Sequence, residues 1–271
     1  MNKLYKALIF DRQVSLSVLE TTKLVNDAIA IHNLKEDPAK TLGSLLTAAA
    51  FMSGCLKSDR GAVSLTVKSN GDAGAVSVSG DKDLHIRGYI DGACNGRLNG
   101  GYLTVVKEDG FFRPFVGASE LVGNNVSENL MQYFHMSEQI ETAVAIDAEI
   151  VGGKCVAAGG VVMQLMPGCT QENMDAAEEA MQSFVNVAEV LKQYGADGIM
   201  RRFFSRADTV YEYFPEYKCN CSREKIEKVL ISLGKKELYE IIKEQSKVSA
   251  HCDYCNKDYY FTREDIDKLL C

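Results

Sequence analysis

The chain has 271 residues, of which 46% are hydrophobic and 25% charged, a globular composition sufficient for one or two domains. Its formal net charge of −7 argues against a general nucleic-acid binder, because such proteins present a basic surface. No apolar run reaches a membrane-spanning length, and residues 1–7 are not expected to be a signal peptide. Nine cysteines without a secretion signal indicate a reducing compartment, where thiols bind metal or undergo redox chemistry.

The N-terminal part is predicted to contain two strands followed by two helices. Residues 4–10 form a short apolar run typical of a strand, and residues 14–18 alternate as its partner would. Thr21 or Thr22 is expected to cap the first helix. The second helix is expected over residues 38–57, where many small residues would allow close approach to a sheet or another helix.

A strand-rich stretch follows, and Asn70-Gly71 within it is a strong hairpin turn. The glycine-rich segment 88–101 lacks a Gly-x-Gly-x-x-Gly motif, so turns and bulges are favoured over a nucleotide loop. Gly152-Gly153 and Gly159-Gly160 are both predicted as turns. Helices among antiparallel hairpins predict an α+β class rather than a doubly wound sheet. The strands are expected over residues 62–68, 75–78, 84–90, 102–106, 111–116, 142–146 and 161–166.

Residues 171–194 are predicted to form one long helix that ends at Gly195, with a shorter helix over residues 198–204. An apolar stripe runs along the long helix, and it contains Met174, Ala177, Met181, Phe184, Ala188 and Leu191. The stripe has three interpretations: packing on the core of the first domain, a dimer contact, or an apolar surface that is exposed on demand. These interpretations can describe successive states of one segment.

The last 53 residues, from Cys219, form a small segment in which Ser222 is a helix N-cap candidate. Residues 259–261 are predicted as a short strand, and Thr262 with Asp265 as the capping box of a final helix. So small a domain buries too little apolar surface to be safely stable alone. The predicted organisation is a mixed α/β N-terminal core domain over residues 1–168, a helical linker over 169–218 and a C-terminal four-cysteine domain over 219–271.

The strongest motif is a pair of cysteine knuckles, Cys219-Asn220-Cys221 and Cys252-Asp253-Tyr254-Cys255, separated by a helical spacer. Two such pairs brought together make a tetrahedral four-thiolate zinc site. The alternative is a set of unrelated thiols. His251 is a substitute ligand that four thiolates make unnecessary. A thioredoxin-like role is disfavoured because Cys252 does not lie between a strand and a helix of a βαβ unit.

A zinc site of this type allows two kinds of function. Spacing alone favours a permanently closed structural site, because most four-cysteine sites are structural. If oxidants reach the thiolates, however, sulfenic acids and disulfides would form and zinc would leave. A domain that needs zinc would then unfold. No Ser/His/Asp set can be assembled, so no enzymatic activity is expected.

The cysteine motifs and their surroundings closely resemble those of the redox-regulated heat-shock holdase chaperones of thirty-three kilodaltons, a bacterial family. The resemblance covers nearly the whole chain and is weakest in residues 169–218. The matching segments are Lys218-Cys219-Asn220-Cys221-Ser222-Arg223-Glu224-Lys225, Leu233-Gly234, His251-Cys252-Asp253-Tyr254-Cys255, Tyr259-Tyr260-Phe261, Thr41-Leu42-Gly43-Ser44-Leu45-Leu46-Thr47-Ala48 and Tyr133-Phe134-His135-Met136-Ser137-Glu138-Gln139.

The resemblance implies a cytoplasmic, ATP-independent holdase that binds unfolding client proteins during oxidative and heat stress. It implies that Cys219, Cys221, Cys252 and Cys255 hold one zinc ion per chain in the reduced form. On oxidation, disulfides would join Cys219 with Cys221 and Cys252 with Cys255, and zinc would be released. The redox domain and linker would then unfold, and the active form would dimerise. Client-binding candidates in the linker are Met174, Met181, Phe184 and Leu191.

The competing hypothesis is a zinc-stabilised interaction or nucleic-acid adaptor without a redox switch. Residues 219–271 carry ten basic and ten acidic residues, a neutral balance that does not favour nucleic acid. No membrane partner is expected. Cys271 lies outside the family pattern and could form a mixed or intermolecular disulfide. The remaining thiols, Cys55, Cys94, Cys155 and Cys169, are simply interpreted as core or surface cysteines.

Overall fold

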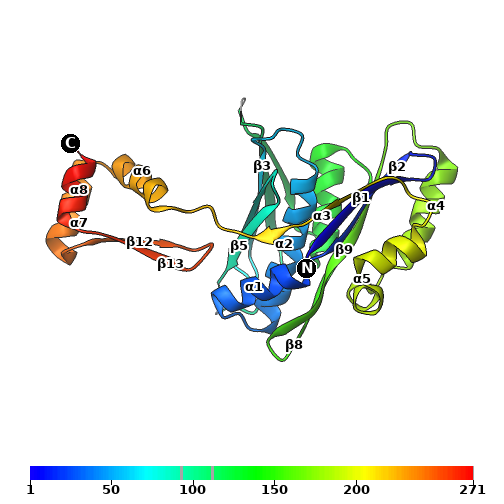
Figure 1. Cartoon of the computed structure of the whole chain (residues 1–271), viewed down its shortest axis with the longest axis horizontal. Helices are drawn as coiled ribbons and strands as arrows, with labels where there is room; N and C mark the ends of the chain where they lie inside the picture. Colours follow the sequence, from blue (N-terminus) through cyan, green and yellow to red (C-terminus); the bar gives the residue numbers. More distant parts are fainter. Residues whose placement is uncertain (92–93, 111–112, 271) are drawn as a thin grey trace. The chain divides into compact units, whose positions relative to one another are not determined.

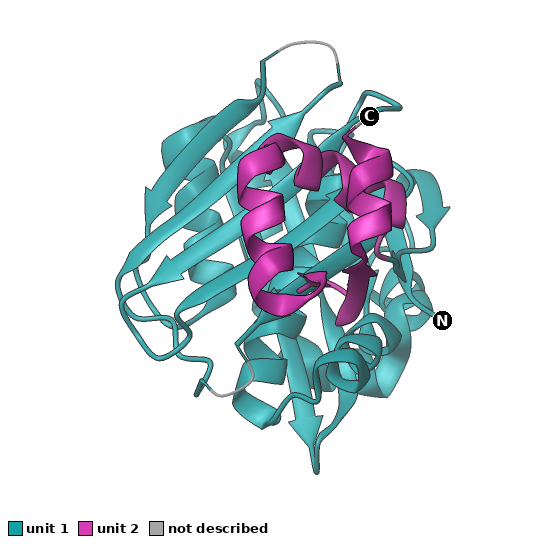
Figure 2. Cartoon of the chain, turned by 90° about the vertical axis from the view of Figure 1, so that its left-hand side faces the viewer, with its two compact units in different colours: residues 1–218 teal, residues 219–271 magenta. Residues whose placement is uncertain are grey.

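The computed structural model describes residues 1–91, 94–110 and 113–270 of the chain. The chain divides into two compact units, Met1–Lys218 and Cys219–Cys271 (Figures 1 and 2). Helices and antiparallel strands are mixed in the first unit, which confirms the predicted mixed α/β class. Among the described residues, none of the helices is long and apolar enough to cross a membrane.

The first unit contains two sheets whose strands are mostly antiparallel. Alternating burial along their strands explains why hydrophobic alternation predicted most of them. The first sheet contains, in spatial order, β10 (Asp208–Tyr213), β1 (Lys3–Ile9), β2 (Val14–Glu20), β9 (Lys154–Leu165) and β8 (Thr142–Val151). The second contains β11 (Glu216–Tyr217), β5 (His85–Ile90), β4 (Ala75–Asp81), β3 (Ala62–Ser69), β6 (Gly101–Glu108) and β7 (Phe115–Glu120).

The predicted hairpins in the second sheet are largely confirmed. β3 and β4 pair in antiparallel register around Asn70-Gly71, although the turn extends to Gly74. β6 pairs with β7, but β7 spans Phe115–Glu120, so the predicted strand 111–116 overlaps it only at residues 115–116. Residues 111–112 of that prediction lie outside the described residues. Gly92, part of the glycine-rich segment, also lies outside them.

Helices α1 (Thr22–His32) and α2 (Glu36–Gly54) pack inside the first unit, and α2 contacts strands of both sheets. Small residues allow this close packing, as predicted. A Cβ added at Gly54 would lie 2.6 Å from the Leu4 side chain. The Thr21 hydroxyl does not cap α1, because it hydrogen bonds at 2.6 Å to the Thr47 hydroxyl instead.

Helix α3 (Val126–Tyr133) and the following π-helical turn η1 (Phe134–Glu138) lie against β7 and β8. The Ser127 hydroxyl contacts both backbone groups of Ile146 in β8: it accepts from the N–H at 2.8 Å and donates to the carbonyl at 3.1 Å. A single side chain therefore joins α3 to the outer edge of the first sheet.

The prediction of one long helix over residues 171–194 is wrong. The segment forms α4 (Gln171–Gln182) and α5 (Val187–Phe203), separated by a turn over residues 183–186. The helical backbone that starts at Val187 is interrupted at Gly195, as predicted, because Gly195 has non-helical angles of φ 61° and ψ 176°. The shorter helix predicted over residues 198–204 is likewise confirmed as the part of α5 that follows this kink and ends at Phe203.

The prediction of a turn at Gly159-Gly160 is also wrong, because both glycines lie inside β9. A Cβ on Gly159 would approach the Leu19 carbonyl oxygen to 2.1 Å, and one on Gly160 would approach the Ala145 carbonyl oxygen to 2.5 Å. These glycines therefore allow neighbouring strands to approach closely. Gly152 and Gly153, by contrast, form the β8–β9 turn as predicted, with positive φ at both residues.

Strand β10 was not predicted from the sequence, yet it pairs with β1 at the edge of the first sheet. A polar network joins β1, α5 and β10 at this edge. The Lys3 ammonium lies 2.7 Å from Asp197 and 3.1 Å from Glu212. The Tyr5 hydroxyl lies 2.6 and 2.8 Å from the same two carboxylates and can donate its single proton to either of them. The network attaches the second half of α5 to the sheet.

The second unit is built around a six-residue apolar core of Leu230, Leu238, Ile242, Val248, Phe261 and Ile266. The Ser222 N-cap and the Thr262–Asp265 capping box are both confirmed. Its hairpin strand β12 was not predicted, whereas β13 contains the predicted strand 259–261. The elements are α6 (Arg223–Leu233), α7 (Lys235–Gln245), β12 (Val248–Cys252), β13 (Lys257–Phe261) and α8 (Arg263–Leu269).

Candidate metal centre

Local structure brings the two cysteine knuckles into position within the second unit. Cys219 and Cys221 immediately precede the Ser222 N-cap of α6. Cys252 is the last residue of β12, and its carbonyl accepts the Cys255 N–H at 3.2 Å. The carbonyl also accepts the Asn256 N–H at 2.8 Å, and Asn256 has a positive φ of 56°. The second knuckle is therefore the tight turn between β12 and β13.

The four predicted cysteine ligands come together, because their sulfur atoms all lie within 4.8 Å of one another. The Sγ atoms of Cys219 and Cys252 are 3.7 Å apart, and those of Cys221 and Cys255 are 3.2 Å apart. A tetrahedral ion with bonds of about 2.3 Å to sulfur requires sulfur atoms about 3.8 Å apart. The four-sulfur arrangement is compatible with a zinc site.

The electrostatics of the cluster also suit a cation. Burial opposes ionisation of Cys221, but hydrogen bonds from the Tyr259 hydroxyl and neighbouring thiols outweigh it and lower the Cys221 pKa to about 7. Burial raises the pKa of both Cys252 and Cys255. Four thiolates this close repel one another, so a divalent cation would stabilise their common ionised form.

Tyr259 is a site residue that sequence analysis missed. Its hydroxyl lies 3.1 Å from the Cys221 sulfur, and this contact raises the pKa of Tyr259 to about 12. In sequence, an aromatic residue in a short strand indicates only core packing. The signal that could have identified it is its position four residues after Cys255, on the strand that leaves the second knuckle.

Histidine does not join the sulfur cluster. The His251 ring pairs instead with Asp258 across the β12–β13 hairpin, with 2.8 Å between Nδ1 and Oδ1. A second group with metal-binding spacing contains Asp81, Asp83 and His85. The Asp81 carboxylate accepts the backbone N–H groups of Asp83 and His85 at 3.0 and 3.1 Å, so it organises the β4–β5 turn.

The other described cysteines lie in the first unit and are free thiols. Cys155 is buried, and burial raises its pKa to about 12, so it is a poor nucleophile. Cys55 is exposed, and Cys94 and Cys169 are half-buried. Cys271 lies outside the described residues.

Most of the predicted apolar stripe packs on the first sheet. Phe184 is fully buried, and its ring lies 5.2 Å from that of Phe203 and 5.8 Å from that of Phe204. Leu191 is buried in the same cluster and Met181 is half-buried against it, whereas Met174 is half-buried and outside it. The structure therefore shows the packed state among the interpretations of this stripe.

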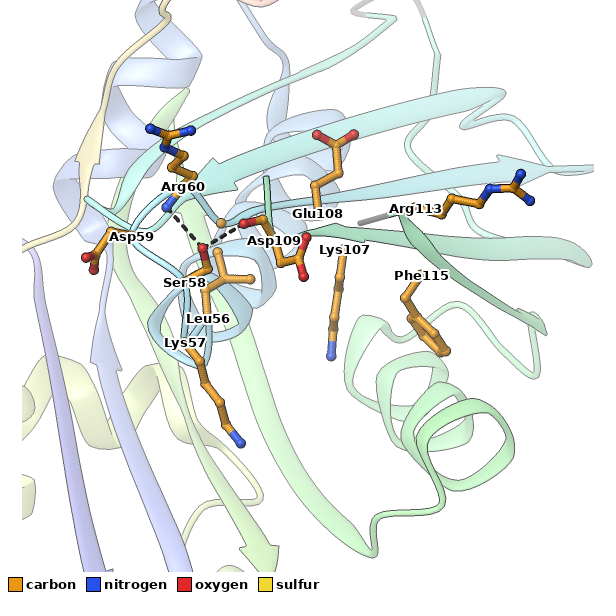
Figure 3. Close-up of a pocket in the computed structure, with 11 residues that line it drawn as sticks. Leu56, Lys57, Ser58, Asp59, Arg60, Lys107, Glu108, Asp109, Arg113 and Phe115 are labelled. Carbon is orange, nitrogen blue, oxygen red and sulfur yellow. Dashed lines mark hydrogen bonds between the residues drawn. The ribbon is translucent and has the colours of Figure 1, made fainter. Parts of the chain in front are cut away.

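A surface pocket of about 750 Å³ lies in the first unit, between residues 56–61 and the end of β6 (Figure 3). The Ser58 hydroxyl in its wall donates to the Asp109 carbonyl at 2.7 Å and accepts the Arg60 N–H at 3.3 Å. Its described lining contains neither histidine nor cysteine. Ser58 therefore supports a turn and is not placed beside a histidine base as a nucleophile would be.

Comparisons with known proteins match nearly the whole chain. A family model described as Hsp33 protein matches residues 2–262. A 33 kDa chaperonin of Clostridium perfringens (strain SM101 / Type A) is 35% identical, covering 99% of this chain and 91% of that protein. A 33 kDa chaperonin of Bacillus cereus (strain AH187) is 32% identical, covering 98% of each. The crystal structure of a 33 kDa chaperonin from Thermotoga maritima has a TM-score of 0.84 at 28% identity, covering 99% of this chain and 97% of that chain.

Proposed function

This chain belongs to the Hsp33 protein family, and from that membership we propose that it is a redox-regulated, ATP-independent holdase that keeps unfolding client proteins from aggregating. The relatives named 33 kDa chaperonin support a chaperone function. The observation that supports the redox part is the convergence of four cysteine sulfurs within 4.8 Å, in a unit whose described residues include only six buried apolar side chains.

In the reduced protein, Cys219, Cys221, Cys252 and Cys255 would be the ligands of one zinc ion. Bound zinc would keep these sulfurs deprotonated and connect the segment before α6 to the β12–β13 turn. The ion would supply folding energy, on the order of 10 kcal/mol for structural sites. The small apolar core of this unit explains why such a contribution would decide whether it folds.

Oxidation would remove the ligands in pairs, forming one disulfide between Cys219 and Cys221 and another between Cys252 and Cys255. In each pair, two thiolates give two electrons to one peroxide molecule, whose O–O bond breaks and which takes up two protons to leave as two waters. A sulfur–sulfur bond forms in the same sequence. With all four ligands consumed, residues 219–271 would lose the contribution that keeps them folded.

The functional division would then be a core domain over residues 1–168, a linker over 169–218 and a redox-switch domain over 219–271. Release of the linker would expose apolar surfaces that are now covered, including Phe184, Leu191 and the sheet beneath them. Met174 and Met181 would add flexible side chains suited to irregular clients. We further propose that the active form is a homodimer and that it works in the cytoplasm without binding nucleic acid.

Zinc release and chaperone activity must be followed in the same samples. Peroxide is added to the zinc-loaded protein at raised temperature, while a chromogenic chelator reports zinc and light scattering reports aggregation of a denaturing client. The proposal expects zinc release and suppression of scattering together. Cys169→Ser is the control variant, because Cys169 lies outside the cluster. This variant should release zinc and suppress scattering as the wild type does.

Two outcomes would contradict the switch. Zinc release without suppression, or suppression that is constant before and after oxidation, would make the four-cysteine site purely structural. A shift of labelled nucleic acid by the protein at physiological salt would instead favour an adaptor function.

A further inference from the structure

Tyr259 contacts the cysteine cluster from outside both knuckles. It lies in β13 opposite Ala250 of β12, and its half-buried ring packs against the apolar core of the second unit. Its hydroxyl is 3.1 Å from the Cys221 sulfur, which is itself 3.2 Å from Cys255. The ring is therefore held by packing while its polar end reaches one sulfur of the cluster.

The direction of this hydrogen bond follows from the chemistry of the site. A thiolate that binds a cation has no proton, so the Tyr259 hydroxyl must donate and the Cys221 sulfur must accept. Such outer partners orient a metal ligand and tune its electron density. The Cys219 and Cys252 sulfurs are 3.7 Å apart in the same cluster.

We propose that Tyr259 is a positioning residue of the redox site: its hydroxyl fixes the Cys221 sulfur for zinc binding and makes that sulfur less reactive toward peroxide. This proposal rests on the zinc-binding function proposed above. The Tyr259 hydroxyl would then help to determine the peroxide concentration at which zinc is released.

The reaction of Cys221 with peroxide uses one electron pair of its sulfur. When Cys221 reacts, its sulfur attacks one peroxide oxygen, an S–O bond forms, the O–O bond breaks, and hydroxide leaves and is protonated to water. A neighbouring cysteine sulfur then displaces the sulfenic oxygen as a second water and forms the disulfide. A hydrogen bond from Tyr259 draws electron density from the Cys221 sulfur and makes it a weaker nucleophile. The attack of this sulfur on peroxide is therefore slower.

The test compares Tyr259→Phe with Tyr260→Phe in the full-length, zinc-loaded protein. Both changes remove only a hydroxyl. The Tyr260 side chain is 49% exposed, and its ring remains beneath the Lys247 ammonium, 4.2 Å from the ring centre, after the change. Circular dichroism checks that each variant keeps its fold. Zinc affinity is measured by competition with a chelator, and peroxide oxidation is followed at each cysteine by mass spectrometry after quenching.

We expect Tyr259→Phe to weaken zinc binding about 10-fold, the lower end of the effect of removing an outer partner. We also expect the Cys219–Cys221 disulfide to form severalfold faster relative to the Cys252–Cys255 disulfide, and Tyr260→Phe to behave like the wild type. Unchanged affinity and rates in Tyr259→Phe would overturn the proposal. So would equal acceleration at all four cysteines, because that would indicate general loosening of the unit.

These outcomes separate the positioning role from the function it rests on. A wild-type chain that binds no zinc would overturn the proposed function and the role of Tyr259 together. A wild-type chain that binds and releases zinc as proposed, beside a Tyr259→Phe variant that matches it, would overturn the role of Tyr259 alone.

Discussion

Replacing Phe184 by alanine should release the α4–α5 segment from the first sheet without oxidation. The Phe184 side chain is fully buried, and it packs against the rings of Phe203 and Phe204. Truncating a buried phenylalanine to alanine costs about 3–5 kcal/mol, because apolar contacts are lost and a cavity remains. This contact joins the turn between α4 and α5 to the C-terminal end of α5.

The expected magnitude follows from that cost. Each 1.4 kcal/mol changes an equilibrium tenfold, so the population with an unpacked segment should rise roughly a hundredfold to a few thousandfold. The matched control is Val185→Ala, because the neighbouring Val185 side chain is 76% exposed and should contribute little. The two substitutions remove apolar atoms from adjacent positions of the same turn.

Hydrogen exchange of backbone amides in α4 and α5 measures this directly in the reduced, zinc-loaded protein. Phe184→Ala should speed exchange in both helices, and Val185→Ala should not. If the released segment contributes to client binding, Phe184→Ala should also suppress light scattering by a denaturing client before any peroxide is added. Equal exchange in the two variants would refute the reasoning, because Phe184 would then not hold the segment in place.

Two further predictions concern polar contacts. Hydrogen bonds from Lys3 and Tyr5 lower the pKa of Asp197, so its stabilising effect should be complete above the ordinary carboxyl pKa of about 4 and disappear as the pH falls through the lower folded value. Urea unfolding of the wild type and Asp197→Asn should therefore differ at pH 7 and converge in acid; a difference independent of pH would contradict this. Thr262→Ala should lower the stability of residues 219–271 by about 1 kcal/mol in thermal unfolding, because it removes the cap of α8. Ser232→Ala, which removes no cap, is the control, and equal stability of the two variants would refute the assignment.

Much of the fold could be predicted because the sequence pattern of a strand or a helix cap depends on residues that are close together in the chain. Alternation over residues 62–68 predicted β3, which spans Ala62–Ser69. The Thr262–Asp265 pattern predicted its capping box for the same reason. Convergence of the four cysteines was predictable as well, because two close cysteine pairs have the spacing of metal ligands.

The errors arise where tertiary contacts decide the local structure. The apolar periodicity continues through Phe184 whether or not the backbone turns there, so it could not reveal the break between α4 and α5. All residues of β10 are exposed, so that strand lacks the alternation of a half-buried one. Gly159 indicates either a turn or a close approach, and only the neighbouring Leu19 carbonyl distinguishes the two.

The contact between Ser127 and Ile146 has a consequence for how the protein meets other chains. The outer edge of a sheet presents unpaired N–H and C=O groups that can template a strand from another polypeptide and start aggregation. At Ile146, near the middle of β8, one serine hydroxyl engages both groups. An incoming strand would have to displace this hydroxyl to add along the length of β8. At this position, α3 thus keeps the free edge of the first sheet from pairing with another polypeptide.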